Sequence, residues 1–126
     1  DAVVIGEGEV CWPDVLADAE RGALKQRYKA QAEWDFVNAP MPRFDLLDIA
    51  RYNRLTVQTT RGCPLKCAFC ASSILLTPKY KHKPVEKVLA EIDAIKELWP
   101  RPFIEFADDN TFINKKWGKA LLREMA

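Results

Sequence analysis

Several features that would place a protein in a familiar class are missing from this sequence. No apolar run approaches the ~20 residues of a membrane-spanning helix, and the N-terminus lacks the basic segment and apolar core of a secretion signal. The 126 residues carry 19 Lys and Arg against 18 Asp and Glu, so the formal charge of +1 does not indicate a polyanionic partner. Lys79, Lys81 and Lys83 form a short basic run that we expect to be a solvated face. We therefore expect a globular cytoplasmic protein that neither enters a membrane nor binds nucleic acid.

The sequence also lacks ordinary ends. It begins at Asp1 without an initiator Met, and residues 117–126 stop within a helical pattern with neither a C-cap nor a following Pro. We interpret the chain as a fragment of a longer protein. Such a piece is expected to self-associate, because an unfinished sheet exposes backbone edges and an apolar surface.

Cysteine is present, and it is unevenly distributed. Cys63, Cys67 and Cys70 have the spacing CxxxCxxC on a loop directly after the strand-like residues 55–60. Thiolates on so short a loop can converge on one soft metal centre, either iron–sulfur or zinc, in a reducing compartment. Three ligands leave one coordination position open, which favours chemistry over a scaffolding role. Cys11 stands apart and is typical of a small buried apolar residue.

The first part of the chain predicts a small structured segment followed by a connector. Residues 2–5 favour a short strand that ends in a turn with two glycines. A helix is predicted from about Pro13 to near Gly22. Residues 26–45 have weak periodicity and several prolines, which indicates an extended connector.

The second part predicts strands that alternate with helices. Residues 55–60 and 103–107 favour strands, and the strongest helical pattern, at 85–99, lies between them, bounded by prolines. A further helix, capped by Asn114, follows the second strand. This order implies a parallel sheet with right-handed crossovers.

Both predicted strands have one apolar and one polar face. Leu55 and Val57 alternate with polar residues, Thr60 among them, and Glu105 separates two apolar residues. Parallel strands that are covered by helices on both sides are usually apolar on both faces, so the polar face indicates a barrel or partial barrel whose lumen holds a ligand. The chemistry would then lie at the carboxyl ends of the strands, where the cysteine loop and an acidic loop emerge.

The cysteine loop resembles a known signature. With Phe69 directly before the third cysteine, it is similar to the CxxxCxΦC motif of the radical S-adenosylmethionine (SAM) superfamily. Arg-Gly-Cys-Pro at 61–64 and Phe-Ala-Asp-Asp-Asn at 106–110 look most like the cobalamin-binding subgroup. In that subgroup a Rossmann-like cobalamin domain precedes the radical barrel.

The resemblance implies an α/β fold in three parts. Residues 54–126 would be the N-terminal part of a parallel (β/α) partial barrel of the radical SAM type, and residues 25–53 a linker. Residues 1–24 would be the C-terminal strand and helix of a Rossmann-like, cobalamin-binding-like domain. Glu7 and Glu9, in the turn after the first strand, are candidate cofactor-binding residues, or exposed turn residues.

The resemblance also implies the chemistry. Cys63, Cys67 and Cys70 would each hold one iron of a 4Fe-4S cluster, whose fourth iron would bind SAM; an electron donor would then drive reductive cleavage to a 5′-deoxyadenosyl radical. Phe69 would border the adenine, and Asp108 or Asp109 would pair with the methionyl ammonium. Cobalamin, used for methyl transfer or a radical rearrangement on a small molecule, would be bound by the longer parent protein and not by this chain alone.

Other readings of the same residues stay open. The cysteines could form a structural zinc site with His82, the one histidine, although that residue is more typical of a solvated surface. An electron-transfer iron–sulfur domain would need Cys11 as a fourth ligand. The two aspartates could also be no more than an Asx-turn before a helix.

Overall fold

The computed structural model of the protein describes residues 1–72 and 79–126. These residues form two compact units, Asp1–Asp35 and Phe36–Ala126, which we call unit 1 and unit 2. Within the described part of the chain, no helix combines the length and the apolarity that crossing a membrane requires.

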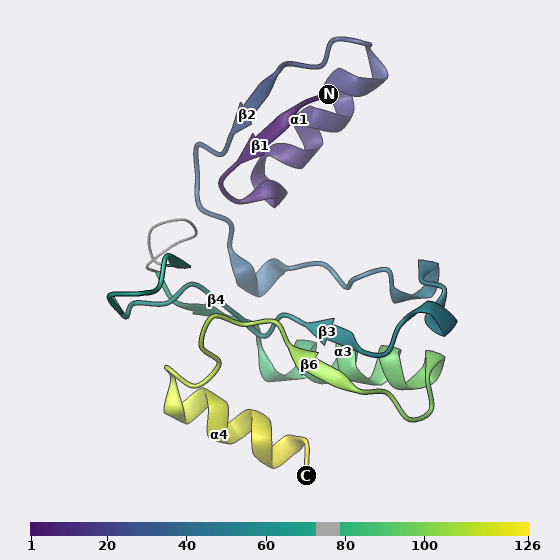
Figure 1. The fold of residues 1–126 in the computed structure, drawn as a ribbon, viewed down its shortest axis with the longest axis vertical. Coiled ribbons are helices and arrows are strands. Elements are labelled where there is room, and N and C mark those ends of the chain that lie inside the picture. Colours follow the sequence, from purple (N-terminus) through teal and green to yellow (C-terminus); the bar gives the residue numbers. More distant parts are fainter. Residues whose placement is uncertain (73–78) are drawn as a thin grey trace. The chain divides into compact units, whose positions relative to one another are not determined.

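Unit 1 is a small strand–helix–strand arrangement (Figure 1). Strand β1 (Val3–Ile5) pairs in parallel with β2 (Arg27–Lys29), and helix α1 (Gly8–Glu20) connects them. The turn into α1 needs a glycine at position 6, because its φ is +93° and an added Cβ would lie 3.0 Å from the Cβ of Ala30.

Helix α1 begins earlier than the sequence predicts. It starts at Gly8 rather than near Pro13, and the carbonyl of Glu7 accepts the first turn's hydrogen bond from the Val10 N–H at 3.1 Å. Pro13 therefore lies inside the helix, where it lacks the N–H that would bond to the carbonyl four residues back. The stop before Gly22, which has a φ of +65°, agrees with the prediction.

A buried carboxylate joins the end of α1 to β2. Asp18 is 5% exposed; it accepts a 2.8 Å hydrogen bond from the hydroxyl of Tyr28 and ion-pairs with Arg21 and Lys25. Strand β2 lies within residues 25–53, for which we expected a linker, and unit 1 continues to Asp35. The sequence gives no strand signal at β2, because its one aromatic residue, Tyr28, lies between two charged residues.

Unit 2 contains the predicted parallel strands. Strand β3 (Leu55–Val57) pairs in parallel with β6 (Ile104–Phe106), and a second pair, β4 (Thr60–Arg61) with β5 (Lys81–His82), is antiparallel. The other elements among the described residues of this unit are the 3₁₀ turns η1 (Phe36–Asn38), η2 (Phe44–Leu46) and η3 (Ile49–Arg51), and the helices α3 (Val85–Leu98) and α4 (Lys115–Glu124).

Helices α3 and α4 form as the sequence predicts. Pro84 is the N-cap residue of α3, and Pro100 follows soon after its end. Asn114 caps α4, since its side-chain oxygen accepts the N–H of Trp117 at 3.1 Å.

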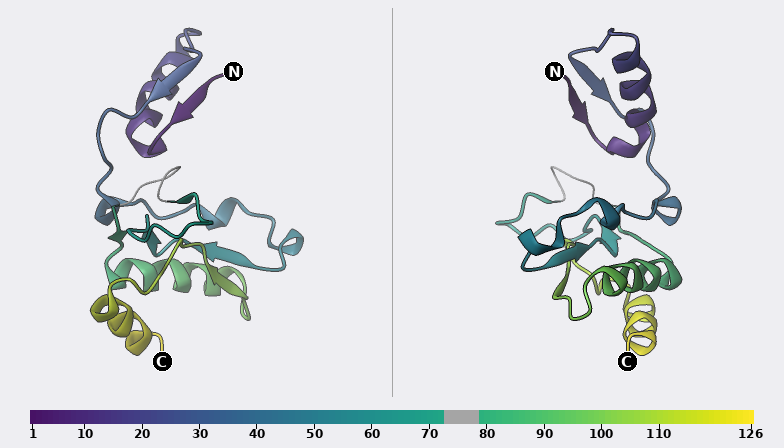
Figure 2. Two further views of the ribbon diagram at one scale, coloured as in Figure 1. Left: turned by 60° about the vertical axis from the view of Figure 1, so that its left-hand side comes forward. Right: turned by 90° about the vertical axis from the view of Figure 1, so that its right-hand side faces the viewer.

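The core of unit 2 lies between the β3–β6 pair and its helices. Helix α3 covers one face of the pair (Figure 2), and α4 packs against α3. The fully or nearly buried apolar residues of this core are Phe44, Leu55, Val57, Val88, Ile95, Trp117 and Leu121. Thr56 and Glu105 are exposed on the other face, so the predicted division of the strands into an apolar and a polar face holds within β3 and β6. The fold is α/β with small parallel sheets, which is consistent with part of a (β/α) barrel.

One residue of the predicted polar face behaves differently. Thr60 is 0% exposed, because the chain leaves β3 after Val57 and enters the separate strand β4. The expectation of one continuous strand from 55 to 60 is therefore wrong at its end.

Candidate functional site

The three cysteines of the loop differ in exposure. Gly62, with a φ of +80°, turns the chain out of β4 into the cysteine loop, which we define as residues 62–70. Cys63 is buried at 8% exposure, Cys67 is exposed and Cys70 is half-buried; all are free thiols. The N–H of Cys70 bonds to the carbonyl of Cys67 at 3.1 Å, which closes a turn between the last two cysteines.

The thiols suit a soft metal in their chemistry, although this conformation does not gather them. Among the residues that the structure describes, no three His, Cys, Asp or Glu side chains are grouped so that they could hold a metal ion. Hydrogen bonding to Ser72 lowers the pKa of the Cys70 thiol, and the nearby charge of Asp109 acts in the opposite direction. Three free thiols within eight residues are a fitting donor set for an iron–sulfur cluster, and the loop would have to close around it.

Phe69 and Asp109 present their side chains to solvent near these thiols. Phe69 is 92% exposed, which is unusual for a large apolar side chain and leaves its ring free to border a ligand. Asp109 is also exposed, and it follows β6 as the cysteine loop follows β3 and β4. Because β3 and β6 are parallel, both segments emerge from the same edge of the pair.

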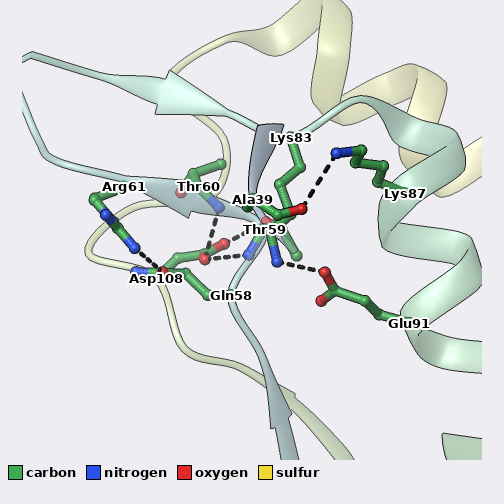
Figure 3. Close-up of polar contacts among 9 residues, drawn as sticks. All are labelled: Ala39, Gln58, Thr59, Thr60, Arg61, Lys83, Lys87, Glu91 and Asp108. Atoms are coloured by element: carbon green, nitrogen blue, oxygen red, sulfur yellow. Dashed lines mark hydrogen bonds and ion pairs between the residues drawn. The ribbon is translucent and has the colours of Figure 1, made fainter. Parts of the chain in front are cut away.

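Asp108 has a different environment from its neighbour (Figure 3). Its Oδ1 accepts the backbone N–H of Thr59 at 2.7 Å and that of Thr60 at 2.8 Å. Its Oδ2 accepts the hydroxyl of Thr59 at 2.5 Å and that of Thr111 at 2.8 Å. The structure thus gives different environments to two adjacent aspartates that the sequence does not distinguish.

A buried ion pair lies close to this network (Figure 3). The Nζ of Lys83 is 2.5 Å from a carboxylate oxygen of Glu91, and the two side chains are 5% and 3% exposed. The Nζ of Lys83 also lies 5.5 Å from the ring centroid of Phe36, and the guanidinium carbon of Arg61 lies 4.6 Å from the same centroid. The expectation that Lys83 belongs to a solvated face is wrong, because pairing with a carboxylate of α3 makes its burial possible.

His82 is not the solvated surface residue that the sequence suggests. It is half-buried in β5, its ring centroid lies 5.1 Å from that of Trp117, and both ring nitrogens have polar neighbours. Nδ1 is 3.3 Å from the carbonyl of Lys83, and Nε2 is 3.4 Å from the side-chain nitrogen of Asn114. These contacts give His82 a packing role and leave neither nitrogen directed at a cysteine.

The remaining candidates lie in unit 1. Glu7 occupies the N-cap position of α1, and its carboxylate accepts the backbone N–H of Trp34 at 2.6 Å. Glu9 lies in the first turn of α1, where a negative charge is favourable. Cys11 is 5% exposed within α1, as expected of a small buried residue.

Comparison with known proteins identifies a matching family and several similar proteins. The sequence model described as the Radical SAM superfamily matches residues 57–126. An uncharacterized methyltransferase, sll1242, of Synechocystis sp. is 36% identical over 99% of this chain and 23% of that protein. Bacteriochlorophyllide d C-12(1)-methyltransferase of Chlorobaculum tepidum is 28% identical over 99% of this chain and 29% of that protein. Hopanoid C-2 methylase of Rhodopseudomonas palustris is 28% identical over 83% of this chain and 20% of that protein. The chain therefore spans less than a third of the length of these relatives.

Proposed function

Because the chain belongs to the radical SAM superfamily, we propose that Cys63, Cys67 and Cys70 hold three irons of a 4Fe-4S cluster and leave the fourth iron for SAM. Membership of this superfamily makes the protein an enzyme, as the cysteine spacing predicted. Loaded with these groups, the parent protein would cleave SAM reductively to a 5′-deoxyadenosyl radical, with the electron supplied by an external donor.

The observation that carries the proposal is that a loop with three free thiols and an exposed carboxylate both follow the carboxyl ends of strands in the β3–β6 region. The cysteine loop follows β4, Asp109 follows β6, and the charge of Asp109 acts on the thiol of Cys70. A carboxylate that borders a bound cluster could pair with the ammonium of a methionyl group. We assign this role to Asp109, since both oxygens of Asp108 already accept hydrogen bonds from threonines.

Phe69 and the polypeptide around it would complete the cofactor contacts. An exposed ring directly before Cys70 offers an apolar face to a purine, and burial of that ring on binding would lower its present exposure of 92%. The role of the protein is to hold the cofactor in place and to keep water away from the radical.

Methyl transfer is the reaction class that we propose for the parent. The relatives named above carry methyltransferase or methylase names, and two of those names specify bacteriochlorophyllide or hopanoid. We propose that cobalamin is the methyl carrier, that a preceding domain ending in unit 1 binds most of it, and that Glu7 and Glu9 face it from the start of α1. Unit 1 alone lacks an Asp-x-His-x-x-Gly sequence for a cobalt ligand, so cobalamin would need residues beyond this chain.

Anaerobic reconstitution of the full-length protein tests the proposal. We expect a brown protein with about four irons per chain, and a change in the electron paramagnetic resonance (EPR) spectrum of the reduced cluster when SAM is added. Single Ala replacements of Cys63, Cys67 and Cys70 should each abolish cluster binding. The matched control is Cys11→Ala, which should keep the cluster because Cys11 is buried in α1.

Two results would favour an alternative to the SAM-binding cluster. A colourless protein that binds zinc would favour the structural zinc site. Loss of the cluster in Cys11→Ala, with a spectrum that SAM leaves unchanged, would favour an electron-transfer domain with four cysteine ligands.

A further inference from the structure

We infer that Asp108 is a positioning residue that fixes Thr59–Arg61, the segment through which the chain enters the cysteine loop. The inference rests on the proposed function of that loop, and it assigns the two neighbouring aspartates different tasks. Asp109 is available to a ligand, whereas Asp108 holds the polypeptide that presents Cys63.

The hydrogen bonds of Asp108 support this role because they use the whole carboxylate. Each of its two oxygens accepts two donors, over distances of 2.5 to 2.8 Å. A carboxylate oxygen with two donors has its lone pairs occupied in the carboxylate plane. Three of the four donors belong to Thr59 and Thr60, and both of these residues are 0% exposed. Asp108 therefore accepts hydrogen bonds from donor groups that water cannot reach.

The other edge of the same segment is held by β5. The carbonyl of Thr59 accepts the N–H of Lys83 at 2.9 Å, and β4 then pairs with β5 so that Thr60 lies opposite His82. Strand β5 leads directly into α3, where Glu91 pairs with Lys83 (Figure 3). The segment is thus fixed between the end of β6 and the start of α3, two residues before Cys63.

The consequence concerns Cys63 more than the other two cysteines. Cys63 is the buried thiol of the loop and follows Gly62, whose φ of +80° makes the turn. Cys67 lies further along and is exposed. We expect the position of the Cys63 thiol to depend on Asp108, because only a fixed Thr59–Arg61 segment defines where the turn begins.

Two replacements of Asp108 separate hydrogen bonding from charge. Asp108→Asn keeps one oxygen for the two backbone N–H groups, and its amide can donate to the two threonine hydroxyls, which are able to accept instead. Asp108→Ala leaves two buried N–H groups without an acceptor. A positioning role therefore predicts that Asn substitutes well and Ala does not. Asp109→Asn is the matched control, since pairing with an ammonium requires the charge itself.

The first measurement is the alkylation rate of Cys63 in the cluster-free full-length protein under reducing, anaerobic conditions, followed by peptide mass spectrometry with iodoacetamide as the probe. Asp108→Ala should accelerate alkylation by about tenfold or more, as expected when the loss of one or two hydrogen bonds eases local opening. Asp108→Asn should stay within about threefold of the wild type, and Asp109→Asn should leave the rate unchanged.

The second measurement is cluster loading and the response of its EPR spectrum to SAM. Asp108→Ala should load less iron, whereas Asp109→Asn should load fully and respond to SAM only at higher concentration. Thr59→Val removes one hydroxyl donor without changing the side-chain shape, and it should give an intermediate alkylation rate. This variant and Asp108→Asn keep the test decisive if Asp108→Ala does not fold.

The inference and the proposed function fail in different ways. Unchanged alkylation of Cys63 in both Asp108→Ala and Thr59→Val would overturn the positioning role and leave the cluster assignment untouched. Full loading of Asp108→Asn with a lost SAM response would also overturn it, because Asp108 would then contact the cofactor. If the wild type binds no cluster, the proposed function fails, while the alkylation rates still decide whether Asp108 positions Cys63.

Discussion

Unit 1 and unit 2 each contain an aspartate that joins a strand to another element, and the two aspartates have different partners. Asp18 of unit 1 pairs with the side chains of Tyr28, Arg21 and Lys25. Asp108 of unit 2 accepts backbone N–H groups and threonine hydroxyls at the entrance to the cysteine loop.

The difference shows how the same side chain can stabilise a fold or define a site. The side chains of Arg21 and Lys25 are 68% and 66% exposed, so water solvates them whenever the contact to Asp18 opens. The groups of Thr59 and Thr60 that donate to Asp108 are buried and have no such alternative. The two cations that pair with Asp18 therefore have water as an alternative partner, whereas Asp108 accepts backbone N–H groups that have none.

The largest effect should come from breaking the buried ion pair of unit 2. Lys83→Met leaves the carboxylate of Glu91 buried without its cation, which costs about 3–5 kcal/mol in comparable pairs. Hydrogen exchange of the α3 peptides in the full-length protein should report a decrease of this size in the free energy of local opening.

The double variant sharpens the same prediction. Replacing Glu91 by Met as well removes the uncompensated charge, and an apolar pair of similar volume is often neutral or stabilising. We expect protection of α3 to return towards the wild-type value. If the single and the double variant lost the same amount of α3 protection, the pair would contribute to stability through packing and not through charge.

A smaller effect is expected at the start of α4. Asn114→Ala removes the side-chain acceptor of the Trp117 N–H, at a typical cost of about 1 kcal/mol. The matched control is Asn114→Ser, which retains an acceptor at the N-cap. Faster exchange in the first turn of α4 for Ala but not for Ser would support the cap, and equal exchange in both would contradict it.

In unit 1 the expected effect depends on pH. The hydrogen bond from Tyr28, followed by that from Arg21, holds the pKa of Asp18 below its ordinary value of 3.8. A carboxyl group with a lowered pKa in the folded state stabilises the fold above its unfolded pKa and loses this contribution as the pH falls through the folded pKa. Protection of β2 amides should therefore decrease below about pH 3.8 in the wild type, and Asp18→Asn should show reduced protection with a weaker dependence on pH.

The smallest effect is expected at an exposed ion pair. Arg43 and Asp45 lie 2.7 Å apart with side chains 67% and 54% exposed, and the guanidinium of Arg43 lowers the pKa of Asp45. Water and salt screen such a pair, so Asp45→Asn should leave exchange across η2 unchanged within error. A clear loss of protection there would show that the exposure of a carboxylate does not by itself predict how much it contributes to the stability of this protein.

The elements that carry strong periodicity were predictable. Helix α3 has its apolar residues three and four positions apart between prolines, and α4 has Asn114 at its cap, so both form where the sequence places them. The parallel pairing of β3 with β6 follows from the order of strands and helices. Strand β2 and the early start of α1 were not predictable, because β2 has a charged residue on each side of Tyr28 and Gly8 is a weak helix former.

The sequence by itself indicated the superfamily, because the cysteine spacing with Phe69 before the third cysteine resembles its signature, and the superfamily model over residues 57–126 confirms the membership. Only the tertiary structure distinguished Asp108 from Asp109 and buried Lys83 against Glu91. The physical reason is that a side chain's task depends on which groups lie within hydrogen-bond distance and whether water reaches them. Residues 49 positions apart, such as Thr59 and Asp108, meet only when the sheet forms.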